Sequence, residues 1–599
     1  MDADGPRSWL QRKAQVAPTA SQVTRRGGQR VQAVLTSAHM WWQHRDHDRL
    51  APEITWRGFV AAILALFAAA AAMGAPPPTV ADAPLFAGLR PYHPSAGTSS
   101  ALAQRYFEQG MTLAWGFNPA EAARSFAAAT RVDPHCAACY WGLAWVKGPN
   151  INTDMDAAAA IEVAAALQHA QALVHVAPER YRGLIAALAV RHPGPTAPID
   201  EAAYAMHMRA LAQRHPRDAE IATLAAEAEL NLHPYDWWDA DGAGKPWTAT
   251  ATDLLARALR LAPDHPGANH YWIHVMESSA HPERALASAL RLATLAPGSG
   301  HLLHMPAHIY MRVGRYADAT RANEAAIAAD RAYLAQVDAQ RAYRVGYVAH
   351  NHHFLFASAA MEGKSREALS AAEAAYPATC GPTPGDRSTG ILQQYSVLPL
   401  FARVRFGQWR EILEDTLPPE VNAPYPRAIW HYARGTAYAK TGRLIEAHDE
   451  LVRLDAIALD PALQQVKIKN INAAAALVRI AQLTLQADIA AAEDRIADAV
   501  TLLTQAVAIE DGLVYDEPHL WLAPTRHALG AALLAAGRWD DALRVYREDL
   551  RHYPGNGWSL AGVADALRRS GRLEEAQIVE RQARAAWRSA DVPLPGSRF

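Results

Sequence analysis

Residues 269–312 read NHYWIHVMESSAHPERALASALRLATLAPGSGHLLHMPAHIYMR, and the fold prediction rests on them. The stretch holds two histidine pairs of the same spacing, His270 with His274 and His304 with His308. Residues four apart share one face of an α-helix, so each pair presents two imidazoles side by side. The second pair follows the first after 34 residues, a period typical of repeated helical hairpins. Consecutive hairpins are therefore predicted to carry histidine at equivalent positions.

The hairpin pattern extends over most of the chain, from about residue 100 to 588. It recurs as GRYADA at 314–319, for example, and as LGAALLAAGRWDDALRVYREDLRHYP at 529–554. Glycine and alanine let paired helices approach closely, aromatic side chains fill the space between them, and proline ends a second helix. About eleven hairpins fit this pattern, which predicts an all-α, right-handed solenoid with a concave groove.

Breaks in the pattern suggest domain boundaries. The Gly- and Pro-rich residues 377–390 predict a division between an N-terminal lobe over 100–376 and a C-terminal lobe over 391–588. Residues 76–99 are Pro-rich and aperiodic, as expected of a linker.

The N-terminal region has the composition of an export signal. Residues 1–57 form a basic tail, and residues 58–75, GFVAAILALFAAAAAMGA, form an uncharged apolar run. The excess of basic residues before this run places the N-terminus on the inner side of a membrane. The run is either a signal peptide or an inner-membrane anchor, and a start at Met40 would give a shorter leader. In each case the folded part is expected to be exported, to the periplasm or outside the cell.

The charge balance bears on the kind of partner. Lys and Arg number 58 against 60 Asp and Glu, for a net charge of -2. Proteins that bind nucleic acid usually carry a basic excess, so no nucleic-acid partner is expected.

On these repeat anchors the chain resembles the tetratricopeptide-repeat (TPR) superfamily over most of its length. More narrowly, it resembles a group of large bacterial TPR proteins. The closer likeness is carried by DPHCAACYWGLAWVKGPNIN at 133–152, HYWIHVMESSAHPERAL at 270–286, HLLHMPAHIYMRVGRYADA at 301–319 and EPHLWLAPTRHALG at 517–530. The resemblance implies that positions 2, 5, 9, 12 and 13 of each repeat face the groove.

In this register, seven groove positions of three consecutive repeats are histidine. They are His270, His274, His301, His304, His308, His350 and His353. Positions 9, 12 and 13 add further groove candidates: Glu227, Glu277, Met311 and Met361.

Several other residues keep more than one interpretation in this register. Trp141 and Trp145 fall at positions 5 and 9 of an earlier repeat, where they either line the groove or belong to the core. His352 is expected between helices, and His265 and His281 are expected at the surface. Cys136 and Cys139 form a C-x-x-C that suits a disulfide, a metal site or simply two small residues at a helix start: three interpretations that stay open.

Seven groove imidazoles predict a transition-metal site. Neighbouring helices lie about 8–10 Å apart and metal–nitrogen bonds are about 2.0–2.1 Å long, so rings from adjacent helices can reach one or two ions. Imidazole suits Cu, Zn, Fe or Ni; the Met311 and Met361 thioethers would favour copper, and the two glutamates iron or zinc. One alternative is a non-catalytic TPR scaffold that binds a peptide or protein partner in the groove, and another is a packed polar seam of histidines without a ligand. No general base stands out beyond Glu227 and Glu277, so no reaction is assigned.

Overall fold

The computed structural model describes residues 83–89, 92–239, 242–337, 341–379, 390–415 and 423–599. The predicted basic tail and apolar run, residues 1–75, lie outside the described residues. The chain divides into Met1–Thr79 and Val80–Phe599, and everything below concerns the second unit. Within the described ranges, no helix has the length and apolar character needed to cross a membrane.

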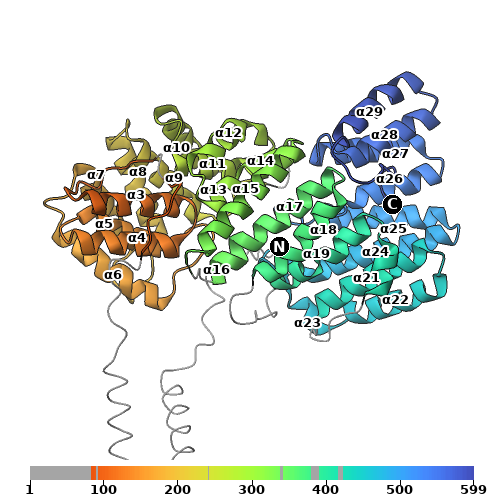
Figure 1. The fold of residues 1–599 in the computed structure, drawn as a ribbon, viewed down its shortest axis with the longest axis horizontal. Coiled ribbons are helices and arrows are strands. Elements are labelled where there is room, and N and C mark those ends of the chain that lie inside the picture. The colour runs from red at the N-terminus through yellow and green to blue at the C-terminus, as the bar shows by residue number, and fades with distance from the viewer. Residues whose placement is uncertain (1–82, 90–91, 240–241, 338–340, 380–389, 416–422) are drawn as a thin grey trace, which may run out of the picture. The chain divides into compact units, whose positions relative to one another are not determined.

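The described part is built almost entirely from helices that pair in chain order (Figure 1). The pairs are α3 (Ala101–Trp115) with α4 (Pro119–Val132), α5 (Ala137–Lys147) with α6 (Ala157–Ala172), α7 (Glu179–Arg191) with α8 (Glu201–Arg214), α9 (Ala219–Leu232) with α10 (Thr248–Leu261), α11 (Pro266–Glu277) with α12 (Leu286–Leu295), α13 (Gly300–His304) and α14 (Pro306–Arg312) with α15 (Tyr316–Leu334), α17 (Ala349–Met361) with α18 (Ser365–Ala378), α19 (Gly390–Arg405) with α20 (Trp409–Glu414), α21 (Pro424–Lys440) with α22 (Leu444–Ala458), α24 (Ala474–Ala492) with α25 (Ile496–Asp511), α26 (Thr525–Ala535) with α27 (Trp539–His552), and α28 (Gly557–Arg569) with α29 (Leu573–Ala586). The predicted all-α fold of TPR-like hairpins is confirmed.

Short elements interrupt this series. A 3-10 turn, η3 (Pro282–Ala285), precedes α12, and α16 (Arg341–Tyr343) runs through a π-helical turn, η4 (Arg344–Val348), into α17. After α23 (Pro461–Gln464), β1 (Lys467–Ile468) pairs antiparallel with β2 (Asn472–Ala473).

The repeat anchors have the roles that the sequence pattern predicts. A Cβ at Gly110 or Gly142 would lie 2.7 or 2.6 Å from the Phe126 ring, so both glycines make room for this aromatic side chain between helices. Turns within the hairpins use glycine with positive φ, as at Gly314 (76°) and Gly442 (76°), where a side chain would be strained.

Residues in the expected linker and on both sides of the expected lobe boundary make packing contacts. Residues 83–89 lack helix but are packed: the Tyr106 hydroxyl donates to the Ala83 carbonyl at 3.0 Å, and Phe86 is buried. Helices α18 and α19, which flank residues 380–389, pack against each other. The division into two lobes stays a prediction. Cys136 and Cys139 form a disulfide at the start of α5, so the C-x-x-C does not supply two free thiolates to a metal.

Candidate metal centre

The first helices of three consecutive hairpins bring the predicted histidines together. Helix α11 carries two of them, the α13–α14 segment carries three, and α17 carries two. Pro306 begins α14, so the middle segment is broken between its second and third histidines. All seven imidazoles are buried, with at most 8% of any residue exposed.

Six of the seven histidines form two triads. The first is His270, His274 and His301, and the second is His304, His308 and His350. In each triad, one ring nitrogen from every histidine lies within 4.8 Å of the others. Three nitrogens bound to one ion are about 3.4–3.6 Å apart, so the nitrogens of a triad have to approach by up to about 1.4 Å to hold a metal. The triads are neighbours, since the His274 and His308 ring centroids are 5.8 Å apart.

Hydrogen bonds orient the rings so that the Nε2 atoms meet. His270 Nδ1 donates to the Trp115 carbonyl at 2.5 Å, and His304 Nδ1 donates to Asn323 Oδ1 at 2.7 Å. The Asn323 amide group donates to the Ala319 carbonyl at 2.8 Å, which fixes its oxygen towards His304. A metal-binding histidine is normally held by such a bond from its other nitrogen. Nε2 is therefore the free coordinating atom of both rings.

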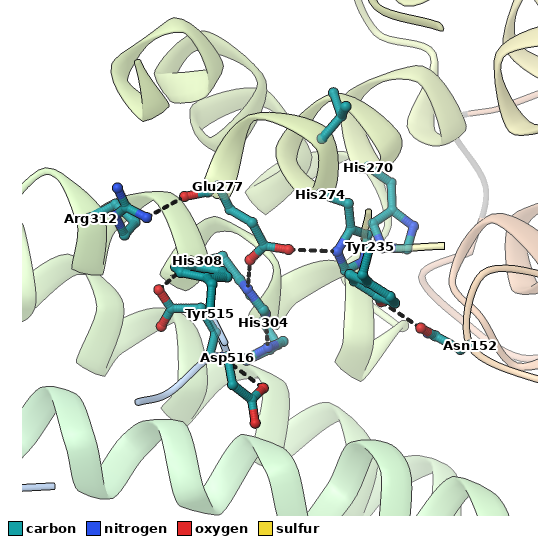
Figure 2. A network of polar contacts seen from close by, with 12 residues as sticks. Asn152, Tyr235, His270, His274, Glu277, His304, His308, Arg312, Tyr515 and Asp516 are labelled. Atoms are coloured by element: carbon teal, nitrogen blue, oxygen red, sulfur yellow. Dashed lines mark hydrogen bonds and ion pairs between the residues drawn. The ribbon is translucent and has the colours of Figure 1, made fainter. Parts of the chain in front are cut away.

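Glu277 joins the two triads (Figure 2). One carboxylate oxygen accepts from His274 Nδ1 at 3.0 Å, and the other accepts from His308 Nδ1. Burial would raise the pKa of Glu277, but His308 and His274 outweigh it and hold the pKa well below its usual range. Glu277 is thus an ionised acceptor shared by one histidine of each triad. The sequence pattern placed it in the site, but as a candidate ligand.

Inside the second triad, two ring nitrogens face each other. His304 Nε2 and His308 Nε2 are 2.8 Å apart, while both Nδ1 atoms are committed as donors to Asn323 and Glu277. If both rings are neutral, each carries its proton on Nδ1 and both Nε2 atoms are acceptors. Two such atoms repel each other at this distance unless a cation lies between or beside them. In the first triad His301 Nε2 approaches His270 Nε2 at 3.1 Å, and His274 Nε2 has no hydrogen-bond partner.

Burial favours the unprotonated, metal-binding form of most of these rings. It lowers the pKa of five of the six imidazoles, those of His270, His274, His301, His304 and His350. Because a metal binds the unprotonated nitrogen, a lowered pKa extends the pH range over which the triads can load.

One phenylalanine packs against each triad. The Phe117 ring centroid lies 4.4 to 5.6 Å from those of His270, His274 and His301. The Phe354 centroid lies 4.5 to 5.1 Å from those of His304, His308 and His350. Phe117 has a φ of 51°, which is unusual for a bulky residue. Neither phenylalanine has a signal in the histidine pattern, and both were missed.

The other sequence-predicted residues lie outside the triads. His353 is fully buried beside Tyr395, with both ring nitrogens unpaired. Met311 and Met361 are buried in the hydrophobic core cluster. Trp141 stacks on Trp145 with centroids 5.3 Å apart, so both belong to the core rather than to a groove wall.

The remaining histidines give a mixed result. His352 is outside both triads, as expected, and partly buried. His281 is exposed, as predicted. The surface position predicted for His265 is wrong: it is 4% exposed, because its Nδ1 caps α11 by accepting from the Ala268 amide at 3.1 Å.

Glu227 belongs to a separate buried network. Its carboxylate accepts from the Trp145 indole at 3.1 Å. Burial raises the pKa of Glu227 to about 7, against the lowering effect of Arg191. It therefore supplies no ligand to the triads, whose donor atoms all come from histidine.

Replacing Glu227 with glutamine should make the protein less sensitive to alkaline pH. The folded state holds the Glu227 proton up to about pH 7, whereas the unfolded chain releases it near 4.5. The stability contributed by the neutral carboxyl is therefore lost as pH rises between these two values. Relative to wild type, Glu227→Gln should gain up to about 3 kcal/mol in unfolding free energy between pH 5 and pH 8. Urea unfolding at both pH values measures this, with the exposed Glu283→Gln as control. A pH-independent difference would contradict the expectation.

Loops distant in sequence complete the surroundings of the centre. Tyr515 and Asp516 reach it from the segment between α25 and α26 (Figure 2), and the Tyr515 hydroxyl donates to the Glu517 carboxylate. The Arg312 guanidinium lies 5.3 Å from the Tyr515 ring centroid and donates to the Glu277 carbonyl at 2.7 Å. No helical period in the sequence connects these loop residues to the site. The passage 517–530 is nevertheless one of those that carry the narrower resemblance described above.

No family model matches the chain, and no curated protein matches its sequence. Similar solved structures include the human IFIT1 dimer with m7Gppp-AAAA, at 14% identity and a TM-score of 0.28, covering 82% of this chain and 91% of that one. The human IFIT1 dimer with PPP-AAAA matches at 12% identity and a TM-score of 0.27, covering 82% and 92%. At these TM-scores the similarity says nothing about ligands, and the TPR-like fold rests on the hairpins themselves.

Proposed function

We propose that this chain is an exported TPR-like metalloprotein that holds two transition-metal ions, one in each histidine triad, for metal-dependent redox or hydrolytic chemistry. The observation that carries the proposal is the 2.8 Å approach of His304 Nε2 to His308 Nε2 while both Nδ1 atoms are engaged as donors. An ion bound by both nitrogens and by His350 turns this repulsion into coordination.

A shared proton is the competing explanation for that close approach. A proton accounts for one pair of nitrogens, His304 with His308. It does not account for a second triad beside the first, nor for the buried, unpartnered His274 Nε2. Two ions account for all six rings, and Glu277 supplies the anionic partner that buried cations need.

The donor set narrows the choice of metal. Three imidazoles without a carboxylate suit copper, zinc or nickel better than magnesium, calcium or manganese. Glu277 is occupied as the acceptor for His274 and His308, which removes the argument for iron from a ligating glutamate. Three protein ligands leave a coordination position open for a substrate or water, as in catalytic rather than structural metal sites.

Burial weighs against the alternative of a groove that binds a peptide through its histidines. A peptide needs accessible side chains, and none of the six histidines is more than 8% exposed. Export is part of the proposal: it is supported by residues 58–75, and a disulfide at Cys136–Cys139 suits an oxidising compartment.

Metal analysis of protein purified without a histidine tag tests the proposal. About two equivalents of copper, zinc or another transition metal per chain are expected after reconstitution and removal of loosely bound ions. His281→Ala, which removes an exposed histidine outside the centre, should bind the same amount. Protein that stays metal-free after incubation with each of these metals would refute the proposal and leave a shared proton as the explanation.

A further inference from the structure

Three polar side chains lie where the buried centre meets solvent. They are Asn152, from the loop after α5; Tyr235, from the loop after α9; and Tyr347, from the π-helical turn η4. Tyr235 is 48% exposed and Asn152 is also exposed, in contrast to the buried histidines behind them. Figure 2 shows Tyr235 beside His274, with its hydroxyl towards Asn152.

Hydrogen bonds connect the three side chains in one direction. The Tyr235 hydroxyl donates to Asn152 Oδ1 at 2.5 Å, and Asn152 Nδ2 donates to the Tyr347 hydroxyl oxygen at 3.3 Å. Tyr347 accepts in this chain, so its own O–H proton remains available to a further acceptor. Bonds in such a chain polarise one another, which makes the last hydroxyl a better donor.

Both tyrosines contact the first triad. The Tyr347 ring centroid lies 4.7 Å from that of His301, and the Tyr235 centroid lies 6.1 Å from that of His274. The ring of Tyr347, the last residue of the chain, thus packs on the triad that contains an unpartnered Nε2, that of His274.

Uncommon backbone conformations hold these tyrosines in place. Tyr235 has a φ of 59°, a left-handed conformation that large side chains rarely adopt. Tyr347 belongs to a π-helical turn, a feature often found at functional sites. Neighbouring residues anchor both segments. Near Tyr235, the Trp238 indole donates to the Val275 carbonyl on α11 at 2.5 Å, and near Tyr347, the Tyr343 hydroxyl donates to Asp330 at 2.7 Å. Such strain persists only where surrounding contacts enforce it, and it gathers at binding sites.

We propose that Asn152, Tyr235 and Tyr347 form a subsite that binds a small anion at the open coordination position of the ion in the first triad. This inference rests on the proposed metal centre. The metal attracts the anion, and the Tyr347 O–H donates a hydrogen bond to the anion. The nearby Glu277 carboxylate does not take the place of the anion, because it is already engaged by two histidines. Asn152 bonds both tyrosines at once, so the three side chains form one hydrogen-bonded unit.

Azide binding to cobalt(II)-loaded protein, followed by visible absorption, tests the subsite. Wild-type protein is expected to change its spectrum on azide addition. Tyr347→Phe should weaken azide binding about three- to tenfold, the effect of one lost hydrogen bond, while cobalt content stays unchanged. Tyr235→Phe, which removes a more distant link, should have a smaller effect. Tyr140→Phe is the control, because Tyr140 packs on His169 away from the centre.

The outcomes separate this inference from the proposed function. If wild-type protein takes up no cobalt or other metal, the metal centre itself is refuted. If cobalt binds but azide leaves the spectrum unchanged, or binds equally well to Tyr347→Phe, the subsite is refuted and the centre stands. If Tyr347→Phe loses cobalt, Tyr347 positions His301 rather than a ligand, which also overturns the subsite.

Discussion

Replacing both His304 and His308 with alanine should reduce the bound metal from about two equivalents to one. These substitutions remove two of the three nitrogens of the second triad and leave His350 alone, which cannot hold an ion tightly. The first triad keeps all of its ligands, so one equivalent should remain. Mass spectrometry of metal content, with far-ultraviolet circular dichroism to check helicity, measures the result.

The reciprocal variant is the matched control for this prediction. His270→Ala combined with His274→Ala should also leave one equivalent, now in the second triad. Because cavities in a packed core cost stability, the single His308→Gln provides a milder second test with nearly conserved volume. Helical protein that retains two equivalents in either double variant would show that the triads are not the binding sites.

Glu277→Gln should weaken metal binding at both triads, by about 10- to 100-fold at each. The carboxylate accepts from His274 on one oxygen and from His308 on the other. An amide of the same shape has only one oxygen, so its NH2 group must face one of the two donors. That histidine then has to turn or change tautomer, and the remaining one loses the negative charge that makes its ring a stronger ligand. Competition with a chelator of known affinity measures the two binding constants.

Asn323 supplies the control for Glu277, because it orients only one of the six rings. Asn323→Ala removes the acceptor for His304 and should weaken the second triad alone. If Glu277→Gln also affects one triad only, Glu277 does not couple the two. If it affects neither, the hydrogen bonds from His274 and His308 do not matter for metal binding.

The helical spacing of the histidines predicted most of the site. The i, i+4 pairs and their recurrence after 34 residues placed four triad histidines on neighbouring helix faces, the repeat register added His301 and His350, and all six converge. His353 met the same criteria but lies outside the triads. It is fully buried beside Tyr395, and neither of its ring nitrogens has a hydrogen-bond partner.

Residues in loops were beyond the reach of that reasoning. Phe117, Asn152, Tyr235 and Tyr347 surround the centre from irregular segments, where no period connects sequence position to direction. The error at His265 has a related origin. Proline after it suggested a surface loop, but the residue caps a helix whose start is itself buried.

The sequence alone determined the local geometry of this protein: which residues form helices, how helices pair into hairpins, and which face of each first helix carries imidazole. Those properties depend on contacts within about one repeat, so they appear in the sequence as a pattern of fixed period. The tertiary structure decided that six histidines form two triads, that Glu277 serves both, and that Nε2 is the free atom of each oriented ring. These properties depend on distances between repeats and on the hydrogen-bond partner of each ring, which no spacing along one helix encodes.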